Sequence, residues 1–130
     1  MDTPSPKAQP TALVVHDRLM PGSALANRLV DRGWRVHSQS GVDRLLEWMR
    51  SYRPMLLVIQ LDLRGGDVCR LIQDLRADVG LTHIGILAYG PLASSRLRES
   101  AIVAGAQVVA ADSSILDQLP TLIETALAVD

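Results

Sequence analysis

Pro54-Met-Leu-Leu-Val-Ile-Gln60 is the stretch of sequence that decides the fold. Residues 55–59 form the most strongly apolar run in the chain, which is typical of a central parallel strand buried on both faces. Pro54 ends the helix expected before it, because a proline inside a helix removes a hydrogen bond and clashes with the preceding turn. The stretch therefore predicts the end of a helix followed by the middle strand of a sheet.

Shorter apolar runs and helical stripes alternate on both sides of this strand. Further strands are predicted at 13–15, 34–38, 84–89 and 106–110. The pattern also predicts helices from Ser23 to a cap at Gly33, from a cap at Ser40 and Asp43, from Asp67, over 95–103 and over 115–126. Pro120 fits the last helix only within its first turn. Five strands alternating with five helices predict a parallel sheet covered on both faces.

The composition of the 130-residue chain is that of a single globular domain. Apolar residues make up 48% and charged residues 21%, which argues against a largely disordered chain. Residues 1–10 hold three prolines and little to bury, so we expect a disordered lead-in there and the domain at 11–130. A formal charge of −1 offers no basic surface to nucleic acid, and DNA and RNA are therefore not expected as partners.

The sequence also bears on where the protein resides. No run approaches the ~18 apolar residues of a membrane span, and the first residues lack the apolar core of a signal peptide. Cys69 is the single cysteine, so it has no partner for an internal disulfide, and no His or Lys cluster beside it activates the thiol. We expect a cytoplasmic protein that does not contact membranes.

The ends of the predicted strands resemble those of bacterial response-regulator receiver domains. Residues 13–17, Leu-Val-Val-His-Asp, resemble the first strand of the family, which usually closes with two acids. Residues 54–60 resemble the third strand, which ends in the phosphoacceptor aspartate, and 65–67 and 105–107 resemble two of its turns. The resemblance covers 11–127 and implies a flavodoxin-like (βα)5 three-layer α/β sandwich, with a parallel five-stranded sheet of order 2-1-3-4-5.

The resemblance also implies that the phosphorylation chemistry has been lost. In the family an acidic pair holds Mg²⁺, an aspartate attacks the phosphoryl donor, and a hydroxyl and a lysine bind the phosphoryl oxygens. The matching positions here carry His16, Asp17, Gln60, Ala88 and Asp112. An amide cannot form an acyl phosphate, a methyl group cannot replace the hydroxyl, and a carboxylate repels what a lysine attracts. Val109 stands at the aromatic switch position, where a stiff β-branched side chain cannot make the swing of a ring.

Two alternatives give the strand ends another role. Asp62 could serve as the phosphoacceptor of a still active phosphorelay receiver, but only if the strand shifted by two residues, which would misplace the neighbouring turn signals. His16, Asp17 and Asp112 could converge on a metal or a small ligand, making the domain a sensing module. We favour a hydrogen-bonded polar crater in which Arg18 or Arg64 neutralises the acids.

These observations favour a stand-alone pseudo-receiver that binds another signalling protein, or a second copy of itself, without being phosphorylated. No nucleophile-base pair, cofactor loop or strong metal motif supports an enzyme, a cofactor or a bound metal. The family's usual contact face is formed by the fourth helix, fifth strand and fifth helix, and here it includes Leu92, Arg96, Glu99, Val108 and Val109. Val108 makes this face more apolar and better suited to a constitutive contact.

Overall fold

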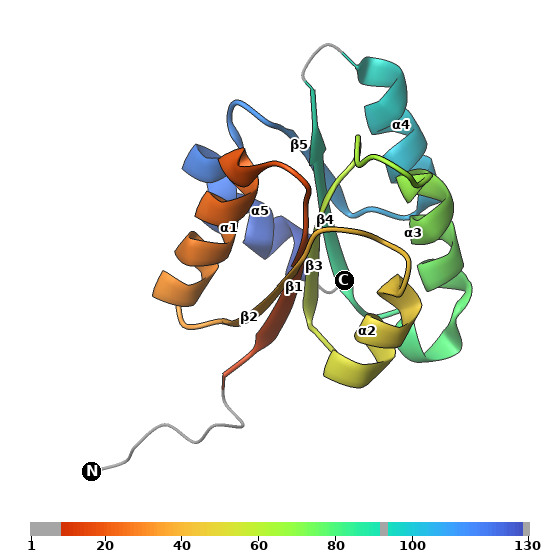
Figure 1. The fold of residues 1–130 in the computed structure, drawn as a ribbon, viewed down its shortest axis with the longest axis horizontal. Coiled ribbons are helices and arrows are strands. Elements are labelled where there is room, and N and C mark those ends of the chain that lie inside the picture. The colour runs from red at the N-terminus through yellow and green to blue at the C-terminus, as the bar shows by residue number, and fades with distance from the viewer. Residues whose placement is uncertain (1–8, 92–93, 129–130) are drawn as a thin grey trace.

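The structure is a computed structural model that describes residues 9–91 and 94–128. Residues 1–8 of the lead-in predicted at 1–10, and Leu92, lie outside the described residues. Strands and helices alternate along the chain (Figure 1), with the bounds β1 Thr11–Val15, α1 Leu19–Asp31, β2 Arg35–Gln39, α2 Leu45–Tyr52, β3 Leu56–Gln60, α3 Val68–Ala77, β4 Gly85–Gly90, α4 Ser95–Ala104, β5 Val108–Ala111 and α5 Ile115–Leu127. A short 3₁₀ helix, η2 (Val79–Leu81), links α3 to β4.

All five strands are parallel and follow the order β2-β1-β3-β4-β5. Helices α1 and α5 cover one face of this sheet, and α2, α3 and α4 cover the other (Figure 1). The predicted fold class, a flavodoxin-like three-layer sandwich, is thus confirmed. None of the helices described is both long and apolar enough to cross a membrane.

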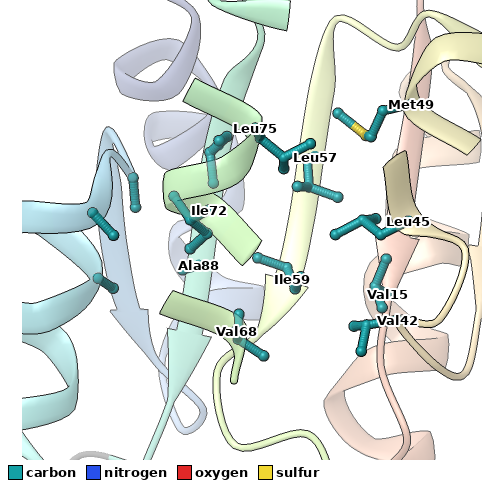
Figure 2. Close-up of a cluster of buried hydrophobic side chains, with 14 of the residues drawn as sticks. Val15, Val42, Leu45, Met49, Leu57, Ile59, Val68, Ile72, Leu75 and Ala88 are labelled. Atoms are coloured by element: carbon teal, nitrogen blue, oxygen red, sulfur yellow. The ribbon is translucent and has the colours of Figure 1, made fainter. Parts of the chain in front are cut away.

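The β3 strand is the centre of the core, as its apolar run predicts. All of its residues are buried, and alternate side chains serve the two faces of the sheet. On one face Leu57 and Ile59 meet the inner stripe of α3 and the side chains of Leu45 and Met49 from α2 (Figure 2). This packing holds the end of β3, where Gln60 lies, at a fixed position in the sheet.

Two helix predictions were wrong in detail. Neither Ser40 nor Asp43 caps α2, which begins at Leu45 after an Arg44 cap residue that makes no side-chain capping bond. Pro120 lies inside α5 rather than in its first turn. A proline leaves the carbonyl four residues earlier without its helical donor, and here Arg28 of α1 donates to that carbonyl, at Leu116, over 3.4 Å. The neighbouring helix therefore compensates for the proline.

Arg76 joins the carboxyl-terminal end of α3 to the segments that lead into β4 and β5. The guanidinium of Arg76 donates to the carbonyl oxygens of Gly105 at 2.9 Å, Thr82 at 2.9 Å and Ile84 at 2.8 Å. It also donates to the amide oxygen of Gln107 at 2.5 Å. Burial lowers the pKa of Arg76, because it removes water that would stabilise the charged guanidinium.

Candidate functional site

Gln60 lies at the upper edge of the sheet, where the carboxyl ends of the strands meet (Figure 1). Its side chain is 0% exposed, and Gln60 is the only buried residue in the described ranges 9–91 and 94–128 whose side chain ends in an amide or a charged group. A buried amide is stable only if its hydrogen-bonding groups find partners. The partner of Gln60 is Asp17, which follows β1 in the adjacent part of the sheet.

Gln60 and Asp17 form a reciprocal pair. The backbone N–H of Asp17 donates to the Oε1 atom of Gln60 at 3.1 Å, and the Nε2 atom of Gln60 donates to Oδ1 of Asp17 at 2.7 Å. The other oxygen of Asp17 accepts the backbone N–H of Arg64 at 3.0 Å. The Arg64 N–H is the largest cause that lowers the pKa of Asp17, and the Gln60 amide also lowers it. Asp17 is therefore ionised and committed to bonds within the protein.

Arg18 lies between two further carboxylates. Its guanidinium donates to both oxygens of Asp62, at 2.8 and 3.3 Å, and to Oδ2 of Asp112 at 3.1 Å. We call Asp17, Arg18, Gln60, Asp62 and Asp112 the strand-end crater. Arg18 joins the segments that follow β1, β3 and β5, because one cation makes ion pairs with acids from two other strand ends. This is the hydrogen-bonded arrangement expected from the sequence, with Arg18 rather than the Arg64 side chain as the neutralising group.

Tyr89 adds a hydroxyl beneath the crater. Its side chain is fully buried, and burial followed by the charge of Asp112 raises its pKa well above the usual range. The hydroxyl is therefore neutral. Burial also raises the pKa of Asp112, although Arg18 opposes this shift. The Tyr89 hydroxyl and the Oδ1 atom of Asp112 are both buried without a hydrogen-bond partner among the described residues.

His16 does not join the acids. Its Nδ1 atom donates to the carbonyl oxygen of Arg18 at 2.9 Å, and its ring packs against Gly22, where a Cβ atom would collide with it. Within 9–91 and 94–128, no three His, Cys, Asp or Glu side chains are arranged to hold a metal ion. The alternative in which His16, Asp17 and Asp112 converge on a metal therefore does not fit the described residues, because the imidazole is held by the turn that leads into α1.

The prediction that Ala88 lies at the end of its strand was also wrong. β4 continues to Gly90, and Ala88 pairs with Ile59 rather than with Gln60. Because successive residues of a strand point to opposite faces, Ala88 is packed in the core beneath α3. The strand-end residue is Gly90, whose carbonyl accepts the N–H of Asp112 at 2.9 Å, whereas Tyr89, which pairs with Gln60, carries the hydroxyl at this end of β4.

The residues of the predicted contact face separate into two grooves. Glu99, Val108 and Val109 line a groove of about 740 Å³ between α4 and β5, together with the exposed apolar residues Ile102 and Val103. Arg96 lies in the neighbouring groove between α3 and α4. Val109 also packs against the core, so no ring fills the switch position.

Sequence reasoning missed Tyr89, whose hydroxyl lies beneath the crater, and considered Asp62 only as an alternative phosphoacceptor. The structure pairs Asp62 with Arg18 and ends β3 at Gln60, so the strand has not shifted by two residues. The feature that could have identified Tyr89 is its position near the end of β4, one residue before the last residue of that strand. The sequence could not show its depth, because that depends on how α1 and α5 pack over the strand.

Comparison with known proteins finds similar structures but no similar family model. No family model matches the sequence, and no curated protein matches it. Solved structures do match. A protein from Chloroflexus aurantiacus that is named as a response regulator has a TM-score of 0.85 at 21% identity, over 93% of this chain and 99% of that one.

Two further solved structures are similar to this chain over most of its length. The receiver domain of NtrX from Brucella abortus gives a TM-score of 0.81 at 21% identity, covering 92% of this chain and 99% of that one. The chemotaxis response regulator CheY4 of Vibrio cholerae gives 0.74 at 14% identity, covering 88% and 99%. Such low identities bear on the fold alone. The structural neighbours of this chain are response-regulator receiver domains, and it has their fold.

Proposed function

We propose that this chain is a bacterial, cytoplasmic pseudo-receiver, a protein-interaction module that acts without being phosphorylated. The observation that carries the proposal is the buried carboxamide of Gln60 at the end of the central strand, bonded at both of its polar atoms to Asp17. Phosphoryl transfer to this position requires a carboxylate oxygen as nucleophile, and an amide offers none.

The charges of the crater support the same proposal. Both oxygens of Asp17 already accept hydrogen bonds, and Arg18 is bonded to Asp62 and Asp112. A divalent cation would have to displace a guanidinium that is always charged. An arriving phosphoryl group would meet the carboxylate of Asp112, which repels it. A cation or a phosphoryl group would therefore have to displace hydrogen bonds and an ion pair that the crater already makes.

The first experiment tests for phosphorylation directly. We expect no mass increase when the protein is incubated with acetyl phosphate and Mg²⁺ and its intact mass is then measured, because no carboxylate occupies the end of β3. A receiver domain that carries a phosphoacceptor aspartate serves as the positive control. A phosphoryl adduct would overturn the proposal, and its loss in Asp62→Asn would assign the adduct to Asp62 and identify an active phosphorelay receiver.

The contact face that we propose is the groove between α4 and β5. Val108 and Val109 form its floor, and Ile102 and Val103 of α4 are 49% and 84% exposed. Neighbouring side chains of opposite charge, Arg98 and Glu99, line the same groove. In the two-fold contact that we propose, Arg98 of each copy pairs with Glu99 of the other while the valines are covered. We therefore propose a second copy of the chain as one partner of this face.

The groove proposal predicts a concentration-dependent dimer. Val108→Glu is expected to raise the dimer dissociation constant by at least about tenfold, because it places a charge in the apolar floor of the contact. Sedimentation equilibrium over a range of protein concentrations measures this. Val30→Glu, at an exposed valine on α1, is the matched control and should leave the constant unchanged. A monomer at high concentration, or a dimer that tolerates Val108→Glu, contradicts the proposal.

A further inference from the structure

A second charged cavity lies at the other end of the sheet. It has a volume of about 490 Å³ and is lined by α2, the turn into β3, and the segment between α3 and β4. These segments lie side by side at the lower end of the molecule, away from the crater (Figure 1). The lining residues that the argument uses are Arg50, Arg53, Asp78 and His83.

The cavity has more positive than negative groups. Among the described residues that line it, Asp78 is the only one with a carboxylate, and both oxygens of that carboxylate accept hydrogen bonds. One oxygen accepts the N–H of Gly80 at 3.0 Å, and the other accepts from Nε and Nη2 of Arg50 at 3.2 and 2.6 Å. Arg53 makes no ion pair with any described residue, so its charge is not neutralised. Arg50 is held in a defined orientation, and Arg53 carries the excess charge.

The backbone at Arg53 is the second observation. It is the cap residue of α2, and its φ of 48° makes it the only non-glycine residue with positive φ among those described. Glycine adopts this conformation without steric strain, whereas an arginine has to overcome a clash at its Cβ atom. An arginine in place of the favoured glycine indicates that its side chain is useful there.

Apolar groups complete the lining. Pro54, Leu81 and Ile84 contribute to the walls, and the neighbouring Val79 and Met55 are 88% and 51% exposed. A site that combines free guanidinium donors with apolar walls fits a molecule that has an anionic oxygen group and an apolar body. We propose that this cavity binds a small organic oxyanion, a phosphate monoester or a carboxylate, with Arg53 as the main contact and Arg50 as a pre-oriented second one.

The proposal is independent of the crater and of phosphorylation. It assigns the molecule a ligand site at the amino ends of β3 and β4, contacted by side chains from α2 and from the α3–β4 connection. A ligand that bridges Arg53 and His83 would join those two segments. The chemistry is recognition of oxygen atoms by a planar guanidinium, which prefers phosphate and carboxylate over other anions.

The test is a titration of the full chain, labelled with ¹⁵N, with phenyl phosphate, benzoate and inorganic phosphate in parallel. We expect saturable amide shifts at Gly80, Leu81 and His83 with phenyl phosphate or benzoate, and binding of inorganic phosphate that is weaker by about tenfold or more, since it lacks an apolar body. The three ligands distinguish a phosphate monoester from a carboxylate and both from an inorganic anion.

Arg53→Gly is the decisive variant, because it removes the guanidinium and relieves the backbone strain, so loss of folding cannot explain a negative result. We expect it to weaken binding by about tenfold or more. Arg32→Ala, at an exposed arginine that ends α1 on the other face of the sheet, should leave binding unchanged. Absent shifts, shifts that map elsewhere, or unchanged binding in Arg53→Gly would overturn the site. Equal binding of inorganic phosphate would overturn the organic ligand.

Discussion

Replacing Arg76 by methionine is expected to lower the free energy of unfolding by roughly 3 kcal/mol, one of the two largest losses that we anticipate from a single change. The guanidinium donates to three backbone carbonyls and to the side chain of Gln107. Methionine fills a similar volume but donates nothing, so these acceptors lose a charged partner at a half-buried position. Urea denaturation followed by circular dichroism measures the change.

Two variants separate the hydrogen bonds of Arg76 from its charge. Arg76→Lys keeps the charge but cannot span four acceptors with one ammonium group, so we expect it to recover only part of the loss. Arg70→Met, on the same helix, removes an exposed ion pair with Asp74 at 3.8 Å and should cost less than about 0.5 kcal/mol. If Arg76→Met were as stable as Arg70→Met, the joint between α3, β4 and β5 would not depend on these bonds.

Gln60→Glu is expected to destabilise the protein by roughly 3 kcal/mol at neutral pH, although the two side chains have nearly the same shape. In the native pair, Nε2 of Gln60 donates to Asp17 Oδ1 over 2.7 Å. Glutamate replaces that donor with a second negative oxygen at a position that is 0% exposed. The repulsion acts where water cannot screen it, and the substitution therefore tests whether the amide is a donor.

The stability that Gln60→Glu loses should depend on pH, and the loss should become smaller as the pH falls. In the unfolded chain the new glutamate titrates near its usual value of about 4.3, whereas burial and the charge of Asp17 raise its pKa in the folded protein. The penalty is complete above the folded pKa and diminishes as the pH falls through it, because a protonated glutamate can donate to Asp17 again. Stability of wild type and variant should therefore converge on acidification.

The matched control for this variant is Gln73→Glu, on the exposed side of α3, which adds the same charge without burying it. It should change stability by less than about 0.5 kcal/mol at every pH, since an exposed carboxylate is hydrated and screened. Thermal denaturation from acid to neutral pH compares the three proteins. A pH-independent loss in Gln60→Glu would show that packing, rather than the bond to Asp17, holds Gln60 in place.

The sequence by itself determined the architecture and the chemistry of its central strand end. The apolar run of β3 requires burial on both faces, which only a parallel sheet between two layers of helices supplies. The position of Gln60 follows at once, because the first polar residue after such a run lies at the edge of the sheet. The sequence alone also shows that this position carries an amide and no carboxylate, because that depends only on which residue is present.

Only the tertiary structure decided which side chains complete the crater. His16 and Arg18 both follow β1, and the path of the turn into α1 holds the imidazole on the Arg18 carbonyl while the guanidinium reaches Asp62 and Asp112. Ala88 and Tyr89 are neighbours, yet a shift of one residue in a strand exchanges the two faces. Residue types identify the available groups, but turn geometry and strand register decide which of them meet, and these depend on contacts between segments far apart in the sequence.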